Sequence, residues 1–185
     1  MDELYIKKVL DGDIDAFRYF VHQYKDRAYN LAFSVLKDEF DARDAVQEAY
    51  IIAYRKLGKF RGRSKFSTWF FRIVINEALK IFKKPGKEKY ITDTRTESVE
   101  PGHVEINDIL GRDQQKYYIN QAMQNIASKE ALALTLFYIE EYSLEEIREV
   151  TGWTVSNIKV LLHRARRHMY DQLNALLTTE KKTLY

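Results

Sequence analysis

The segment that decides the fold class is residues 143–169, SLEEIREVTGWTVSNIKVLLHRARRHM. Its apolar spacing predicts a short amphipathic helix over 144–150, a break at Gly152 and a second, longer helix after it. Ser143 and Glu146 form the sequence pattern of a capping box, which marks the start of the first helix. Two helices joined by a tight turn are typical of a helix-turn-helix, whose second helix enters the major groove of DNA.

The second helix of this segment is expected to carry the DNA-contacting side chains on its polar face. Residues near the start of a recognition helix contact base edges, so Ser156, Asn157 and Lys159 are the candidate base readers. Asn pairs with adenine and Lys donates to guanine. Farther along, the candidate DNA contacts are His163, Arg164 and Arg167, the arginines being suited to phosphates. An ordinary helical hairpin with a solvated basic face would share this pattern.

Helical periodicity also runs through the rest of the chain, and no segment alternates as a strand would. Helices are predicted from an Asp13 cap to about residue 36, over about 41–57, from residue 67 or 68 to 82, over 114–126, and from a Ser128 cap to about 141. The chain has only 7 Gly and 2 Pro in 185 residues, which suits a helical protein with few sharp turns.

Both prolines lie in one polar stretch without helical periodicity, which indicates a linker. The expected fold class is therefore all-α, with two small helical domains joined by a flexible linker. The expected boundaries are 1–84 for the first domain, 85–112 for the linker and 113–185 for the second domain, which contains the helix-turn-helix.

Composition excludes several classes of protein. With 45% hydrophobic and 31% charged residues the chain can build a core and is not expected to be disordered. It has no cysteine, which excludes disulfides, thiolate chemistry and cysteine-ligated metal sites, and no cofactor is expected. No apolar run approaches the ~18 residues of a membrane span, and the N-terminus lacks a signal-peptide pattern. We therefore expect a cytoplasmic protein without membrane insertion.

Positive charge is concentrated in two islands. Residues 54–89 carry 12 basic and 2 acidic side chains, and residues 159–168 carry four basic and no acidic ones. The chain as a whole has a formal net charge of only +3. Two separate basic islands indicate two contacts with a polyanion, although solvated helix faces are the alternative.

The predicted helix over 41–57 has an acidic face, formed by Asp41, Asp44, Gln47 and Glu48. Three carboxylates on one face suggest a divalent metal, but a straight helix spreads them over about 10 Å, too far for one ion. The face is therefore expected either to be solvated or to dock a basic partner.

The first basic island contains the segment 60–84, FRGRSKFSTWFFRIVINEALKIFKK. Three consecutive aromatic residues, 69–71, cannot all face the core because adjacent helical positions diverge by about 100°. At least one should lie near the surface, where an aromatic ring among cations can stack on unpaired bases. The candidate single-strand contacts here are Arg61, Arg63, Lys65, Trp69 and Arg72.

The segments 41–57, 60–84 and 143–169, in this order around a linker, closely resemble the extracytoplasmic-function group of bacterial sigma factors in the sigma-70 family. The resemblance covers nearly the whole chain. It implies an N-terminal domain for the promoter minus-10 element and a C-terminal domain for the minus-35 element. One departure is Leu161, where the family often has Arg.

The resemblance also assigns partners and surfaces. The acidic face of 41–57 matches the surface that docks on the β′ clamp helices of core RNA polymerase. The loop 60–67 matches the one that holds a base flipped from the non-template strand, and Asn76 matches the minus-10 contact surface. The implied partners are core polymerase, promoter DNA and an anti-sigma factor.

Two other functions compete with this interpretation. A free-standing helix-turn-helix regulator would leave the acidic helix and the aromatic basic segment unexplained. A metal-dependent nuclease using Asp41, Asp44 and Glu48 would need carboxylates that lie closer together, and the four histidines form no i, i+4 pair.

Overall fold

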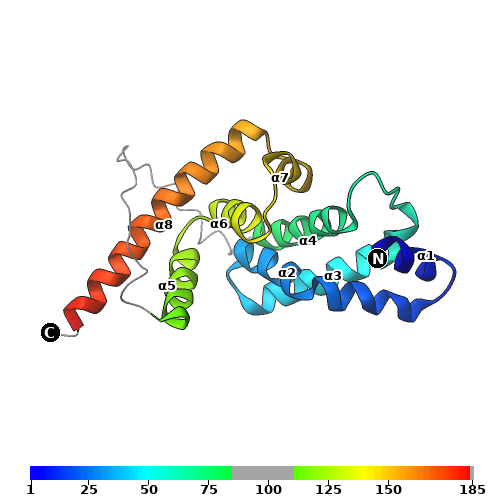
Figure 1. Cartoon of the computed structure of the whole chain (residues 1–185), viewed down its shortest axis with the longest axis horizontal. Coiled ribbons are helices and arrows are strands. Elements are labelled where there is room, and N and C mark those ends of the chain that lie inside the picture. Colours follow the sequence, from blue (N-terminus) through cyan, green and yellow to red (C-terminus); the bar gives the residue numbers. More distant parts are fainter. Residues whose placement is uncertain (85–110, 184–185) are drawn as a thin grey trace.

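The computed structural model describes residues 1–84 and 111–183, and all regular structure in these two ranges is helical (Figure 1). The first range contains α1 (Asp2–Leu10), α2 (Arg18–Leu36), α3 (Glu39–Lys56) and α4 (Phe66–Phe82). The second contains α5 (Arg112–Asn125), α6 (Ser128–Leu134), α7 (Leu144–Thr151) and α8 (Val155–Thr183). The expected all-α fold is confirmed. Within these ranges no helix is long and apolar enough to cross a bilayer. The predicted flexible linker falls almost wholly outside the described residues.

The first part of the chain packs α2, α3 and α4 against one another. Four alanines of α3 are completely buried, and their small side chains let the neighbouring helices approach closely. Phe20, Phe70 and Phe71 fill the remaining space as fully buried rings. Trp69 is only half-buried, so the expectation that one of the three consecutive aromatics would stay near the surface is confirmed.

Helix starts in this part follow side-chain caps. The Asp38 carboxylate accepts the backbone N–H of Asp41, which starts α3 two residues before the predicted position. Asp13 accepts the N–H of Ala16 as expected, but the cap starts a 3-10 turn, and α2 begins only at Arg18.

Helix α1 was not predicted from the sequence. Tertiary hydrogen bonds hold it, because the Tyr19 and Tyr24 hydroxyls donate to the two oxygens of the Asp2 carboxylate. The ring of Tyr5 also stacks on that of Tyr19, with 4.0 Å between centroids.

In the second part, the helix-turn-helix forms as predicted. The Ser143 hydroxyl accepts the N–H of Glu146, and the Glu146 carboxylate accepts the N–H of Ser143, which completes the capping box. Gly152 then ends α7 with a φ of +75°, a left-handed conformation that glycine adopts without strain. The predicted Ser128 cap is wrong: Ala127 precedes the helix, and Ser128 is its first residue, with a buried side chain. Helix α6 continues into a π-helical turn at Thr135–Ile139.

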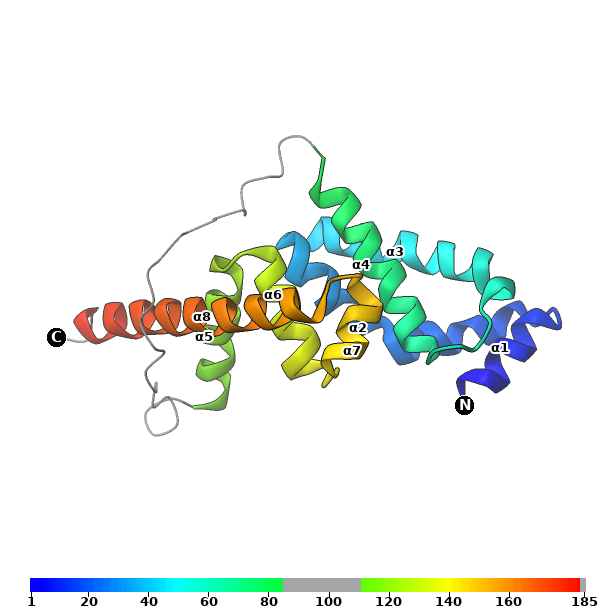
Figure 2. The same ribbon diagram turned by 90° about the horizontal axis from the view of Figure 1, so that it is seen from above.

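The two parts pack directly against each other, which no sequence pattern indicated. Helix α6 lies against α2, and α7 lies against α4, as seen from above in Figure 2. One continuous hydrophobic core runs from Phe20 in α2 to Ala165 in α8. We call this contact between residues 1–84 and residues 111–183 the seam.

Candidate nucleic-acid and polymerase interfaces

The acidic face lies on α3, on the side opposite the alanine row. Asp44, Gln47 and Glu48 are exposed and Asp41 is half-buried, so the structure brings the four predicted residues to one helix surface. In the described parts of the chain, no three ligand-type side chains come together to hold a metal ion.

An apolar groove beside this face escaped the sequence analysis. It lies between α2 and α3, has a volume of about 500 Å³, and includes Gln47 in its wall. Its other lining residues include Val21, Tyr29, Val46, Tyr50 and Ile51. Ile51 and Tyr54 are exposed large hydrophobic side chains on the same helix, and that exposure is the signal of a contact surface.

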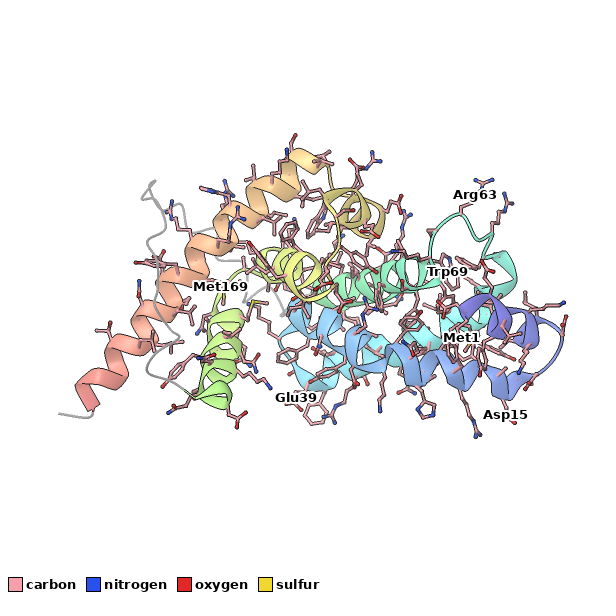
Figure 3. The ribbon with its side chains drawn as sticks, in the orientation of Figure 1. Met1, Asp15, Glu39, Arg63, Trp69 and Met169 are labelled. Atoms are coloured by element: carbon pink, nitrogen blue, oxygen red, sulfur yellow. The ribbon has the colours of Figure 1, made fainter. Side chains whose placement is uncertain are left out.

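The loop before α4 presents its cations to solvent. Arg61, Arg63 and Lys65 are all exposed, and Figure 3 shows Arg63 extending away from the body of the molecule. Gly62 turns the chain between the arginines with a φ of +65°. The loop therefore forms a small cationic rim.

Helix α4 continues this surface. Trp69, Arg72 and Asn76 lie on one face because their spacing of three and four residues brings them together on a helix. Arg72 and Asn76 are exposed, whereas Trp69 is half-buried with its ring 5.2 Å from that of Phe60 and 5.5 Å from that of Phe66. The indole is thus held in place by two other rings, with part of its surface accessible.

The recognition helix α8 exposes most of its predicted DNA contacts. The side chains of Ser156, Asn157, Lys159, His163 and Arg164 are exposed, and Arg167 is half-buried. The hydroxyl of Thr154 accepts the N–H of Asn157 and so helps define the start of the helix.

Two apolar residues of α8 differ in their surroundings. Val160 was not among the predicted contacts, yet it is 48% exposed on the same face, where a branched apolar side chain suits a thymine methyl group. Leu161, the position at which the family often has Arg, is buried in the common core instead.

Charged side chains cross the seam at three points. Arg27 of α2 pairs with the carboxylate of Glu140, whose side chain is only 2% exposed. Lys65, from the cationic rim, pairs with Glu146 of α7 at 3.2 Å. Between these pairs the Tyr142 ring lies 6.5 Å from that of Phe71, and burial raises the pKa of the Tyr142 hydroxyl.

The third crossing point is Lys37. Its ammonium donates to the backbone carbonyls of Met123, Gln124 and Ile126, at the C-terminal end of α5. A cation at this end complements the helix dipole and the unpaired carbonyls. Burial nevertheless lowers the pKa of Lys37 to about 8, a shift that the Glu130 carboxylate partly opposes.

Comparisons with known proteins agree with this architecture. The sigma-70 region 2 family matches residues 20–88, and the sigma-70 region 4 family matches residues 117–169. The ECF RNA polymerase sigma factor SigW of Bacillus subtilis (strain 168) is 33% identical over 180 residues, covering 92% of this chain and 96% of SigW. RNA polymerase sigma-H factor of Pseudomonas aeruginosa is 33% identical over 184 residues, covering 95% of each protein.

The chain belongs to the extracytoplasmic-function group of the sigma-70 family. Sigma factors are non-catalytic subunits that direct RNA polymerase to promoters and start transcription, so the nuclease and free-standing regulator interpretations do not apply. The family predicted from the three sequence motifs is confirmed. Neither family match includes α1 of this sigma factor.

Two solved structures share the fold of this sigma factor. CnrH, in complex with the cytosolic domain of CnrY, has a TM-score of 0.63 at 20% identity and covers 96% of this chain and 97% of its own. The sigma factor RpoE from Bartonella quintana, in complex with the anti-sigma factor NepR, has a TM-score of 0.65 at 22% identity and covers 85% of this chain and 96% of its own.

Lys37 makes the seam dependent on pH. Its pKa is lowered to about 8 by burial in the closed seam, and exposure of the ammonium to water on separation of the two parts would return it toward the ordinary 10.5. Closing therefore releases a proton between these values, and the seam becomes more stable as pH rises from 8 to 10.5. Because the chain has no cysteine, dyes on cysteines introduced at Gln23 and Asp171, both exposed, can report the closed fraction.

The matched variant is Lys37→Met, which removes the titrating group while keeping the long apolar stem. We expect the closed fraction of the parent protein to rise between pH 8 and 10, and the Lys37→Met protein to lose most of that rise. An equal rise in both proteins would show that another group is responsible.

Proposed function

We propose that this sigma factor acts through three surfaces: one docks on core polymerase, one contacts the minus-10 element and one reads the minus-35 element. Residues 1–84 dock on core polymerase and open the minus-10 element, residues 113–185 read the minus-35 element, and residues 85–112 link them. The single observation that supports this most strongly is the placement of two exposed cationic surfaces on opposite sides of the seam, one of them on a helix-turn-helix. The proposed site of action is the cytoplasm.

The docking surface consists of Asp41, Asp44, Gln47 and Glu48 together with the adjoining groove between α2 and α3. A polar rim around an apolar groove is the usual composition of a protein interface. The proposed partner is the pair of β′ clamp helices, whose basic side chains would face the three carboxylates.

We assign the DNA-contacting surfaces from their exposed basic side chains and from the aromatic ring that can stack on a base. On α4 and its preceding loop, Arg61, Arg63, Lys65, Arg72 and Asn76 would hold the single strand while Trp69 packs beneath an unpaired base. On α8, the base readers would be Ser156, Asn157 and Lys159. Arg164 and Arg167 would contact phosphates, and His163 would be a further contact to the minus-35 DNA.

An anti-sigma factor is the proposed inhibitor. RpoE of Bartonella quintana was solved with the anti-sigma factor NepR, and CnrH with the cytosolic domain of CnrY. A similar partner for this chain would hold the two parts in a state that cannot reach both promoter elements.

The closed seam is incompatible with reading a whole promoter. The names minus-10 and minus-35 place the two elements about 25 base pairs apart. This separation is roughly 85 Å along the DNA at ~3.4 Å per base pair. The parts of this chain that would read them are in direct contact. They must separate, and the segment 85–110 is long enough, since a chain of that length extends to roughly 90 Å.

The docking proposal predicts that Asp44→Arg together with Glu48→Arg abolishes binding to core polymerase. Both side chains are exposed, so the fold does not need them. Pull-down with core polymerase and run-off transcription measure the loss, and circular dichroism checks the helices. Asp15→Arg, a charge reversal at an exposed carboxylate outside both the acidic face and the groove, is the control. Unchanged pull-down with intact helicity would contradict the assignment.

The minus-35 proposal predicts two different defects on α8. Lys159→Ala should weaken binding by about 1–3 kcal/mol for particular base pairs only, because a base contact carries sequence information. Arg167→Ala should weaken binding to all sequences and reduce the salt dependence of the affinity. Titrations of a set of minus-35 duplexes at two salt concentrations separate the two. A uniform loss on Lys159→Ala would rule out base reading by that residue.

The seam proposal predicts that Glu140→Gln favours the open arrangement. The change weakens the buried pair with Arg27, and a charged hydrogen bond is worth roughly 1.5–3 kcal/mol. The dye pair described above should show a smaller closed fraction, and open-complex formation should need less sigma factor.

Two controls accompany this experiment. Asp15→Asn weakens an exposed pair with Arg18 away from the seam and should leave the closed fraction unchanged. Binding to an isolated minus-35 duplex should be the same for Glu140→Gln and the parent protein, since α8 exposes its readers in the closed state. An unaltered closed fraction in Glu140→Gln would disprove the role of this pair.

A further inference from the structure

A cavity of about 160 Å³ crosses the seam at the C-terminal end of α2. Residues 30–37 line it on one side, and residues 119–124 of α5 and 135–139 of the π-helical turn line it on the other. Because the two sides belong to different parts of the chain, the cavity is complete only while the seam is closed. Its volume is close to that of cavities that hold a single six-membered ring.

The apolar side of the cavity is formed by Phe33, Ile119, Met123 and Ile139. The Phe33 ring is stacked on that of Tyr29, with 5.8 Å between centroids, so its orientation is fixed. Ile119 is 43% and Ile139 60% exposed, and two large apolar side chains that face solvent around one cavity mark a contact surface. The π-helical turn that carries Ile139 agrees with this, since such turns occur often at functional sites.

Two buried residues with hydroxyl groups, Ser34 and Thr135, also line the cavity. The Ser34 hydroxyl donates to the carbonyl of Leu31 at 2.8 Å, and the Thr135 hydroxyl donates to that of Ala131 at 2.9 Å. Each hydroxyl has one hydrogen, and both hydrogens are used inside their own helices. The two oxygens can therefore only accept a further hydrogen bond, which suits a ligand that carries an N–H donor.

The charge at the cavity favours a neutral donor over a cationic one. Of the described residues that line it, Lys37 alone carries a charge, and its ammonium donates to three backbone carbonyls at the C-terminal end of α5. An ammonium group on a ligand would be repelled by this cation. The exposed Asn30 and Asn120 carboxamides, which both donate and accept, instead suit an uncharged polar group such as another carboxamide.

We propose that this cavity binds a small neutral ligand with one planar ring and one carboxamide, and that the bound ligand stabilises the closed arrangement. The ring would lie against Phe33 and Met123, and the carboxamide N–H groups would donate to the oxygens of Ser34 and Thr135. A ligand shifts an equilibrium toward the state that binds it better, and here only the closed state has both sides of the site. The effect on transcription rests on the proposed separation of the two parts, which the ligand would oppose.

The test uses the full-length chain and two probes of the same shape, benzamide and acetophenone, of which only benzamide has N–H groups. A ligand-observed NMR titration should show saturable binding of benzamide with a Kd of roughly a millimolar, as expected for so small a ligand. Acetophenone should bind about fivefold more weakly, because it cannot donate to the two hydroxyl oxygens. With the dyes at Gln23 and Asp171, benzamide at about ten times its Kd should raise the ratio of closed to open molecules roughly tenfold.

Two matched variants connect the binding to this cavity. Thr135→Val keeps the shape of the side chain but removes a hydroxyl, and should lower the preference for benzamide over acetophenone from about fivefold to about twofold. Thr178→Val removes a hydroxyl of α8 that also donates to a carbonyl of its own helix but lies outside the cavity, and should leave the preference unchanged. The preference compares two ligands on one protein, so partial unfolding of a variant cannot imitate its loss, and circular dichroism checks the helices.

The outcomes separate this inference from the proposed function. No saturable binding of benzamide, equal binding of acetophenone, or a full preference retained in Thr135→Val would overturn the ligand site. Binding without a rise in the closed fraction would overturn its link to the seam. Run-off transcription with core polymerase tests the proposed function: if benzamide raises the closed fraction and the amount of transcript does not fall, the ligand site stands and the proposed need for separation fails.

Discussion

The buried carboxylate of Glu140 is the constraint on which the arrangement of the two parts depends. A charge this deeply buried is costly unless a partner neutralises it, and the partner, Arg27, belongs to the other part of the chain. In the separation proposed above, Glu140 would regain water and need no partner. The proposal therefore implies two stable arrangements, a closed one with the pair formed and an open one with both groups hydrated, and it disfavours partly opened ones.

The seam is also suited to opening. Buried ion pairs contribute little net stability because desolvation offsets their attraction, and the lowered pKa of Lys37 shows the same cost at a second point. The common core, in contrast, stabilises the closed arrangement. There the ring of Tyr142 packs near that of Phe71, and apolar side chains of α6 and α7 are shielded from water. Because these contributions oppose each other, the equilibrium between the closed and the proposed open arrangement can be shifted by a partner. Its binding free energies to the two arrangements would have to differ by a few kcal/mol.

Local sequence signals predicted the helices well, and contacts between distant residues account for what they missed. The capping box at Ser143, the turn at Gly152 and the exposed polar face of α8 depend on neighbours within a few residues, so the sequence pattern was sufficient. Helix α1 is held through Asp2 by tyrosines 17 and 22 residues away. The partners in the Arg27 pair lie 113 residues apart, beyond the reach of any periodicity argument.

Lys65 links the two states of the molecule. In the closed state its ammonium pairs with Glu146, whose carboxylate also completes the capping box of α7 and whose pKa is lowered mainly by its hydrogen bonds to Ser143. In the proposed separation, Lys65 would become available for a phosphate, while Glu146 would keep its bonds to Ser143 and α7 would stay capped. The same cation thus cannot serve the seam and the strand together. The proposed opening of the chain and the proposed capture of DNA would therefore be linked by competition for one side chain, and neither helix would have to change its own fold.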